Sequence, residues 1–320
     1  ALLYQLLKLP AKLGFWLYCR HLRVNNKLAF DLQGPMIIAC NHPNSFLDAI
    51  VISALFKQPV HSLARGDAFK NPFISKILRS MHMLPVYRTS EGVENMEHNY
   101  STFEACKEIF KQNGIVLIFS EGRCTNEWHL RPLKKGTARL ALSSWADSIE
   151  VKILPAGLNY NRFRSYDKNI HCLFGEIFGS ADVVKNEGFG KSIQSFNSLL
   201  QQSLESVVYE IDESNLDSRR KMFKVPVPIW KQVMLIIPAA FACCLHFPLY
   251  MLAKFMANKF GAHNDHYDSI LISSLFLFYP LYLLLILAIT YIYTANMASL
   301  LLTFFLPFCA WSYLQIKNQF

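Results

Sequence analysis

The amino-acid sequence predicts an α/β protein with a mainly parallel sheet covered by helices. We expect an N-terminal interfacial helix before the sheet and C-terminal transmembrane helices after it. Between residues 31 and 228, short apolar runs alternate with amphipathic stretches, which is typical of strands joined by crossover helices. From Ile229 onward the 320-residue chain carries only six charged residues. We therefore divide it into a membrane-interface segment 1–30, an α/β domain 31–228 that we expect to hold any catalytic site, and a membrane domain 229–320.

The composition excludes a disordered chain and argues against a wholly soluble one. Hydrophobic residues make up 52% and charged residues 17%, with a net charge of +9 and a mean hydropathy of +0.20, whereas soluble domains carry about 25% charged residues. The 8 cysteines form no C-x-x-C pair, so we expect neither a disulfide framework nor a zinc site. No nucleic-acid-binding pattern stands out. Membrane lipids and an anionic substrate account better for the positive charge.

The N-terminal segment combines apolar bulk, including Trp16, with positive charge before the first acidic residue, Asp31. Its basic residues are Lys8, Lys12, Arg20, Arg23 and Lys27. This combination predicts an in-plane helix on anionic lipid. A signal peptide is the alternative, but two lysines interrupt its apolar run and no small-residue cleavage site follows.

Two uncharged runs of 22 and 48 residues follow Lys231. The first is about 33 Å long as a helix, enough for a hydrocarbon core of about 30 Å. The second is long enough for two helices, with a break in the tyrosine-rich stretch 291–296. The predicted transmembrane helices are 232–253, 270–290 and 297–316. Pro238 and Pro248 leave open a broken or interfacial helix in place of the first.

Basic residues gather before the first predicted transmembrane helix. Arg219, Arg220, Lys221, Lys224 and Lys231 precede it, whereas Lys254 and Lys259 follow it. The positive-inside rule then places the α/β domain on the cytoplasmic face of a multi-pass protein of the cell (inner) membrane. The oligomeric state stays open.

The predicted sheet elements define where a ligand binds. Candidate strands are Met36–Cys40, His61–Ala64, Met83–Tyr87, Ile115–Phe119, Lys152–Ala156 and His171–Phe174. Candidate helices are Leu47–Phe56, Pro72–Ser80, Glu94–Lys111, Thr137–Ala146 and Ser192–Tyr209. Sheets of this kind bind ligands at the carboxyl ends of their strands. The residues found at those ends are His42, Arg65, Arg88, Glu121, Gly122, Arg123 and Gly157. Together they describe a crevice with a base and several cations.

His42 and Asp48 are the candidate base and its partner. A carboxylate on one ring nitrogen of a histidine fixes the tautomer, and the other nitrogen then accepts a proton. An exposed loop histidine with a helix-capping aspartate is the alternative. Arg88 and Arg123 suit a phosphate or carboxylate, or are solvated loop residues. Glu121 is expected to meet an arginine or a substrate hydroxyl, or to form a structural ion pair.

Four ordered blocks resemble the glycerolipid acyltransferase family, which includes the 1-acylglycerol-3-phosphate acyltransferases. They are Asn41-His42 to Asp48, Leu84-Pro-Val-Tyr-Arg88, Phe119-Ser-Glu-Gly-Arg123 and Ile153-Leu-Pro155-Ala-Gly157. Two departures matter. Five residues separate His42 from Asp48 where the family has four, which would rotate the aspartate by about 100° on a helix. In the third block Ser120 replaces a proline, and the family's arginine position holds Cys124.

The resemblance implies transfer of an acyl chain from acyl-CoA or acyl-carrier protein to a lysophospholipid hydroxyl. The leading acceptor is 1-acylglycerol 3-phosphate, giving phosphatidic acid, and no cofactor or metal is required. His42 with Asp48 would activate the hydroxyl, Arg88 and Arg123 would hold the phosphate, and Glu121 the polar head. Backbone amides near Pro155 and Gly157 would steady the oxyanion. Glycerol 3-phosphate or a lyso-aminolipid acceptor, a hydrolase using Ser45 or Ser120, and an inactive scaffold remain alternatives.

Overall fold

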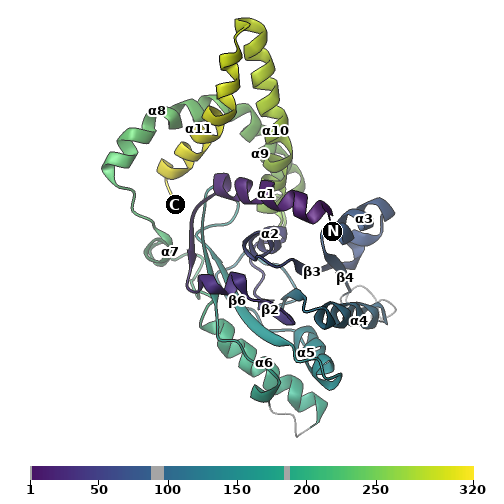
Figure 1. Ribbon diagram of the computed structural model, residues 1–320. Coiled ribbons are helices and arrows are strands. Elements are labelled where there is room, and N and C mark those ends of the chain that lie inside the picture. The colour runs from purple at the N-terminus through teal and green to yellow at the C-terminus, as the bar shows by residue number, and fades with distance from the viewer. Residues whose placement is uncertain (1, 88–96, 184–187) are drawn as a thin grey trace.

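The computed structural model describes residues 2–87, 97–183 and 188–320 (Figure 1). The strands are β1 (Cys19–Val24), β2 (Met36–Cys40), β3 (Val60–Arg65), β4 (Met83–Val86), β5 (Ile115–Phe119), β6 (Lys152–Tyr160) and β7 (Lys168–Phe174). The helices are α1 (Leu2–Tyr18), α2 (Phe46–Leu55), α3 (Pro72–Ser80), α4 (Glu97–Lys111), α5 (Gly136–Ala146), α6 (Phe189–Glu205), α7 (Leu216–Phe223), α8 (Ile229–Leu245), α9 (Phe247–Gly261), α10 (Tyr267–Thr294) and α11 (Leu302–Ile316). The predicted helix from Glu94 begins outside the described residues.

The seven strands form one sheet in the order β1-β7-β6-β2-β5-β3-β4. Every neighbouring pair is parallel except β6 and β7, which are antiparallel. The predicted mainly parallel sheet is therefore confirmed. In the central pair, Cys40 at the end of β2 lies opposite Phe119 at the end of β5. This register places the residues that follow the two strands side by side.

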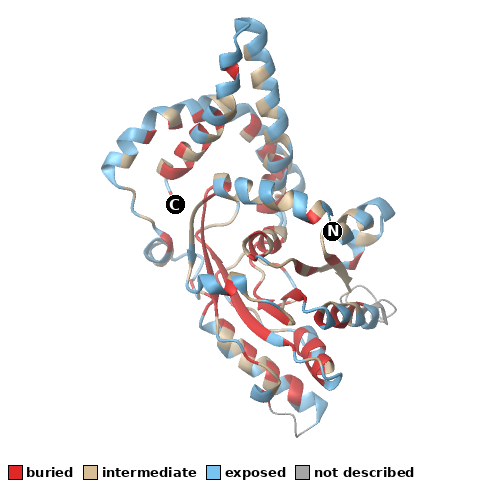
Figure 2. Ribbon diagram, in the orientation of Figure 1, coloured by how far each residue is buried: buried red, intermediate tan, exposed pale blue. Residues whose placement is uncertain are grey.

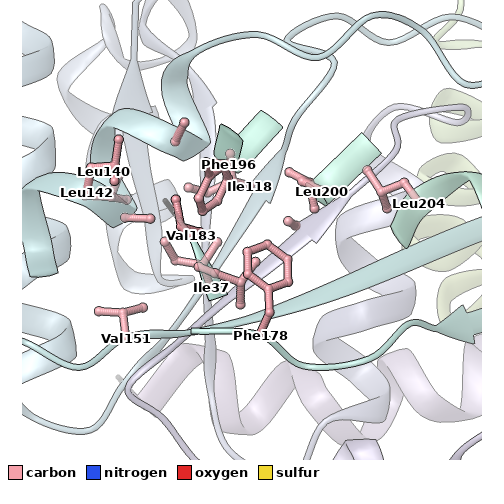
Figure 3. Packing of buried hydrophobic residues seen from close by; sticks show 14 of the residues in the cluster. Ile37, Ile118, Leu140, Leu142, Val151, Phe178, Val183, Phe196, Leu200 and Leu204 are labelled. Atoms are coloured by element: carbon pink, nitrogen blue, oxygen red, sulfur yellow. The ribbon is translucent and has the colours of Figure 1, made fainter. Parts of the chain in front are cut away.

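Helices cover both faces of the sheet, because its central strands are apolar on both sides. One core cluster joins β2, β5 and β6 to α4, α5 and α6, with Ile37 and Ile118 from the strands meeting Phe196 and Leu200 from α6 (Figure 3). The second cluster lies on the opposite face and joins the same strands to α2. Figure 2 shows this burial concentrated in the strands.

The predicted N-terminal segment divides into two parts with different environments. α1 exposes a stripe of large apolar side chains, namely Leu2, Leu6, Leu9, Leu13 and Trp16. Residues Cys19–Val24 instead form edge strand β1 and pair with β7. Arg20 is almost fully buried, with its Nη2 3.6 Å from Oδ2 of Asp167. Extending the interfacial segment to residue 30 was therefore wrong, because β1 completes the sheet and Arg20 has a buried carboxylate partner.

Among the residues that the structure describes, two helices are long and apolar enough to cross a membrane. They are α10, with 28 residues, and the 20-residue segment Met297–Ile316, which contains α11. They leave the sheet domain as a hairpin whose outer surface is mostly exposed (Figure 2). The third predicted span, 232–253, is not one straight helix. α8 and α9 meet at His246 with a bend of 60°. Pro248 lies in the first turn of α9, where its ring is compatible only with a new helix start.

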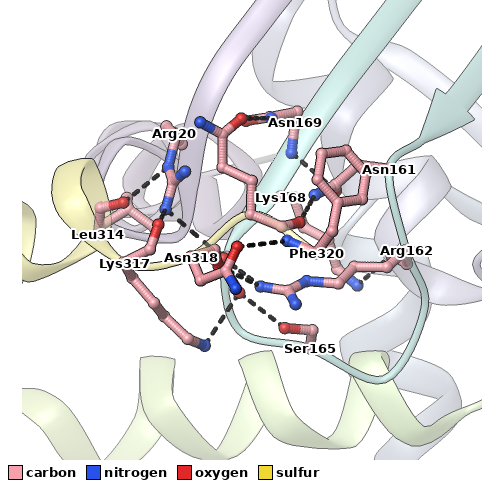
Figure 4. Close-up of polar contacts among 12 residues, drawn as sticks. Arg20, Asn161, Arg162, Ser165, Lys168, Asn169, Leu314, Lys317, Asn318 and Phe320 are labelled. Carbon is pink, nitrogen blue, oxygen red and sulfur yellow. Dashed lines mark hydrogen bonds and ion pairs between the residues drawn. The ribbon is translucent and has the colours of Figure 1, made fainter. Parts of the chain in front are cut away.

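The end of α11 is attached to the sheet domain by polar contacts (Figure 4). The Arg20 guanidinium donates to the carbonyl oxygens of Leu314 at 2.7 Å and Lys317 at 2.6 Å. Asp167, at the turn before β7, is also paired with Arg162 and with Lys317. The helical hairpin and the sheet domain therefore share a polar junction beside β1 and β7.

Candidate active site

The side chains of His42 and Asp48 are in contact. β2 ends at Cys40, so His42 lies just beyond the carboxyl end of a central strand, and Asp48 lies in the first turn of α2. The distance from His42 Nδ1 to Asp48 Oδ2 is 2.9 Å. Asp48 is completely buried, whereas the His42 side chain is 17% exposed. The start of a helix favours the negative charge of Asp48.

The loop before α2 takes up the five-residue spacing. Ser45 adopts a backbone conformation with φ of 53° and ψ of −135°, which is rare for a residue with a side chain. The Asn44 amide donates to Asp48 Oδ2 at 2.8 Å, so this oxygen binds both the loop and the histidine. The extra residue therefore changes the loop path and leaves the two side chains in contact.

Tyr160 completes the polar surroundings of Asp48. Its hydroxyl, at the end of β6, donates to Asp48 Oδ1 at 2.7 Å in a buried position. Burial, and next the negative charge of Asp48, raise the pKa of Tyr160 well above its ordinary value of 10.0, so it remains a donor. The sequence pattern does not predict this residue, because the predicted strand ends at Ala156. The available signal is the apolar Leu158 and Tyr160 on either side of the polar Asn159.

Glu121 follows β5 and holds the backbone on both sides of the site. Its Oε2 accepts the amide proton of His42 at 2.8 Å, and its Oε1 accepts that of Arg131 at 2.9 Å. Burial raises the pKa of Glu121, and these two amides oppose the rise. The prediction that Glu121 contacts an arginine side chain or a substrate was wrong in its first part, because the partner is the Arg131 backbone.

The ring of His42 is held flat against a side chain from the neighbouring strand. It stacks on Phe119 with a distance of 3.8 Å between ring centroids and an angle of 8° between the planes. The contact with Asp48 uses Nδ1, so Nε2 is the ring nitrogen left for a proton from another molecule. Stacking, the Asp48 contact and the Glu121 bond to the backbone together fix the position of this imidazole.

The structure describes two of the three predicted substrate-binding arginines, Arg65 and Arg123. Arg123 is exposed on the loop after β5, and Cys124, at the family's arginine position, is buried and accepts the Ser45 amide at 3.0 Å. Burial raises the pKa of the Cys124 thiol, so it is neutral and supplies no charge for a phosphate. Arg65 is an exposed residue paired with Asp67. Arg88 lies outside the described residues.

Gly122 provides the tight turn between the buried Glu121 and the exposed Arg123. Its φ is +68°, a conformation that glycine adopts at little cost. A Cβ here would also lie 2.8 Å from Cγ of Lys134. The conformation of the backbone thus accounts for a glycine at position 122, which we predicted as a binding residue.

Pro155 and Gly157 point away from His42. Both belong to β6, whose residues alternate between the two faces of the sheet. A Cβ on Gly157 would lie 2.2 Å from the carbonyl oxygen of Val207, which packs in the core cluster of α5 and α6. The site lies against the opposite cluster. The side-chain face that Pro155 and Gly157 share is therefore filled by protein. Strand amides lie in the plane of the sheet, so the contact of nearby backbone amides with an oxyanion stays a prediction.

The alternative nucleophiles have structural partners. Ser120 is buried, and its hydroxyl is 3.0 Å from that of Thr137 in α5. The Ser45 hydroxyl is 2.5 Å from Nδ1 of His266, just before α10. Among the described residues, no group of three or more His, Cys, Asp or Glu side chains has a geometry suited to a metal ion. The hydroxyls of Ser120 and Ser45 are thus each engaged with a side chain other than His42.

Sequence comparisons point to acyl transfer. Residues 21–159 match the family model described as Acyltransferase. A 1-acyl-sn-glycerol-3-phosphate acyltransferase of Bacillus subtilis (strain 168) is 28% identical over 120 residues, which are 37% of this chain and 55% of that protein. A chloroplastic 1-acyl-sn-glycerol-3-phosphate acyltransferase of Brassica napus is 25% identical over 187 residues, covering 52% of this chain and 51% of that protein.

The chain thus spans about half the length of the curated relatives that it matches. Among solved structures, the 1-acyl-sn-glycerophosphate acyltransferase PlsC of Thermotoga maritima matches with a TM-score of 0.42 and 13% identity, over 62% of this chain and 77% of that one. The matched region of the family model contains β2 to β5 with parts of β1 and β6, and it includes His42, Asp48 and Glu121. Residues 21–159 thus match an acyltransferase domain, and the curated relatives support the glycerolipid acyltransferase family.

Proposed function

We propose that this protein is a membrane-bound acyltransferase that moves a fatty acyl chain from an acyl thioester to the free hydroxyl of a lysophospholipid. The proposed acceptor is 1-acylglycerol 3-phosphate, and the product is phosphatidic acid. The observation that carries the proposal is the contact of His42 Nδ1 with the buried Asp48 at 2.9 Å. The names of the two curated relatives favour this acceptor.

The chemistry requires one base. His42 Nε2 removes the proton of the acceptor hydroxyl while Asp48 stabilises the imidazolium that forms. The hydroxyl oxygen attacks the thioester carbonyl carbon, a C–O bond forms, and the C–S bond breaks. The imidazolium then returns its proton to the leaving thiolate, so the histidine is neutral again and no acyl-enzyme is formed. Tyr160, bonded to Asp48 Oδ1, keeps the carboxylate in place through this cycle.

Binding of the acceptor phosphate is assigned to Arg123 and Arg88. A guanidinium offers paired donors to phosphate oxygens. Arg123 is exposed two residues after the buried Glu121, which itself bonds to the His42 amide. A phosphate on Arg123 would therefore sit close to the base. The donor is acyl-CoA or acyl-carrier protein, both of which are anionic and suit a chain of net charge +9.

Membrane attachment is proposed from two surfaces of the protein. The exposed apolar stripe of α1, with the exposed Lys12 on the same helix, suits an anionic lipid surface. α10 and the segment containing α11 are apolar enough to cross the bilayer. α1 runs across the base of this hairpin (Figure 1). With the basic residues before α8 on the cytoplasmic side, His42 would face the cytoplasm near the lipid surface.

The test is acyl transfer by the detergent-purified protein from radiolabelled acyl-CoA and acyl-carrier protein. Acceptors offered in parallel are 1-acylglycerol 3-phosphate, glycerol 3-phosphate, a lyso-aminolipid and water. Labelled phosphatidic acid formed by the wild type and absent from a folded His42→Ala variant is the expected result. Transfer only to another acceptor would replace the proposed substrate. Release of free fatty acid alone would favour a hydrolase, and the absence of turnover an inactive scaffold.

A further inference from the structure

The start of α10 lies beside α2 (Figure 1), and the loop that joins His42 to Asp48 leads into α2. Three side chains at the start of α10 contact the loop. The Asn44 amide group donates to Oδ2 of Asp268 at 3.0 Å. The Leu47 backbone amide donates to Oγ of Ser269 at 3.3 Å, and the Ser45 hydroxyl is 2.5 Å from Nδ1 of His266. More than 200 residues separate the two segments along the chain.

These contacts replace the local cap that α2 lacks. The first amides of a helix have no partner within it, and the side chain of the N-cap residue usually accepts one of them. Ser45 is the N-cap of α2 but makes no such bond. Its hydroxyl is turned to His266, and the amide of Leu47 is satisfied by Ser269 of α10. The N-terminus of α2, which carries Asp48, is therefore capped by another helix.

Asp268 is fixed on its other side by the sheet domain. The Ser165 amide donates to its Oδ1 at 2.9 Å. Its Oδ2 is ion-paired with Lys168 of β7, and both side chains are at most 1% exposed. The same Oδ2 accepts the side-chain amide of Asn44, and the backbone N–H of Asn44 in turn donates to Oδ2 of Asp48 at 2.8 Å. A continuous chain of contacts thus runs from β7 through α10 to the carboxylate beside His42.

We propose that the first turn of α10 positions the catalytic loop, with Ser269 and Asp268 holding residues 43–47 in the path that brings Asp48 to Nδ1 of His42. The extra residue between the histidine and the aspartate requires this support, because the loop passes through the rare conformation of Ser45. The proposal rests on the proposed acyl transfer. It assigns to the helical hairpin a role in catalysis in addition to attachment. Ser269, Asp268 and His266 are positioning residues and do not touch the substrate.

The test compares five single variants of the full chain in phosphatidylglycerol nanodiscs. Ser269→Ala removes the acceptor of the Leu47 amide, and its control is Ser274→Ala, another buried serine of α10. His266→Ala removes the partner of Ser45, and its control is His263→Ala in the same exposed turn. His266→Asn keeps a polar atom at the Nδ1 position. The readouts are kcat, the KM of each substrate, and hydrogen–deuterium exchange of a peptide covering residues 41–48.

We expect Ser269→Ala and His266→Ala each to lower kcat by about fivefold to tenfold, the effect of one lost hydrogen bond, with each KM within about twofold of wild type. The loop amides should exchange faster in both variants. Ser274→Ala, His263→Ala and His266→Asn should match wild type. Unchanged kcat and exchange in the two loop variants, or a lower kcat without faster exchange, would overturn the proposal. If the wild type transfers no acyl group, exchange still tests the positioning, and only the proposed function fails.

Discussion

Tyr160 and His42 bind opposite oxygens of the same buried carboxylate. The tyrosine hydroxyl lies 2.7 Å from Oδ1 of Asp48, and His42 Nδ1 lies 2.9 Å from Oδ2. Because Asp48 is completely buried, each oxygen needs a donor to offset the loss of water. The strand that ends at Tyr160 and the strand that ends before His42 are neighbours in the sheet. The parallel pairing of β2 and β6 is thus what brings the two donors to one acceptor.

Replacing Tyr160 with phenylalanine tests this shared carboxylate. Tyr160→Phe leaves Oδ1 of Asp48 buried without a donor, which should destabilise the fold by about 1–3 kcal/mol. The freed carboxylate should also orient His42 less well, so kcat should fall by about tenfold. Tyr209→Phe, which removes a bond to His171, is the matched control and should lower stability with kcat unchanged. Equal kcat in wild type and Tyr160→Phe would contradict the assigned role of the tyrosine.

The buried Glu121 predicts a pH-dependent difference in stability. Its folded-state pKa is raised above the ordinary value of 4.5 by burial. The stability that this protonated group contributes is present below pH 4.5 and is lost as the pH rises through the folded-state pKa. Glu121→Gln cannot ionise at this position and is the reference. The melting temperature of the wild type minus that of the variant should fall as the pH is raised from 4 to 7. A difference that rises over this range would show that the pKa of Glu121 is lowered.

Gly157 distinguishes a packing role from a binding role. Gly157→Ala brings a Cβ to 2.2 Å from the Val207 carbonyl oxygen, so the strand or the end of α6 must shift. We expect a large fall in melting temperature and an unchanged acceptor KM for the protein that remains folded. Gly136→Ala, where no atom lies within 4 Å of the new Cβ, is the control and should not lower the melting temperature. A raised acceptor KM with an unchanged melting temperature would instead support a role of Gly157 in substrate binding.

Of the two arginines proposed to bind the acceptor phosphate, Arg123 lies within the described residues. Arg123→Ala should raise the KM for 1-acylglycerol 3-phosphate by about tenfold or more, because a charge-assisted contact is lost, and should change kcat little. Arg139→Ala removes an exposed arginine from α5 and should have no effect. The measurement is initial rate against acceptor concentration in mixed micelles. An unchanged KM would move the phosphate site away from this loop.

The sequence was sufficient for the elements that depend on local pattern. Continuous apolar runs predicted β2 and β5, and the residues just after them, His42 and Glu121, were correctly placed at one edge of the sheet. Alternation with helices predicted a mainly parallel sheet but not the order of its strands. The antiparallel turn from β6 to β7 and the addition of β1 depend on tertiary contacts that a local pattern does not contain.

The surroundings of the base depend on distant residues. Asp268 and Ser269 lie just before the predicted transmembrane helix 270–290, and nothing near them in the sequence connects them to Asn44 or Leu47. Gly157 was assigned to binding because it follows an apolar run, whereas the strand continues to Tyr160 and turns Gly157 into the core. The length of β6 therefore determines which of its side chains lie at the site.

The most direct test of the account is the release of free thiol from acyl-CoA or acyl-carrier protein, measured with and without 1-acylglycerol 3-phosphate. If His42 activates the acceptor hydroxyl, thiol release by the wild type should require the acceptor and match phosphatidic acid formation one to one. It should be lost in a folded His42→Ala variant. Thiol release that is independent of the acceptor, or that persists near the wild-type rate in His42→Ala, would contradict the mechanism.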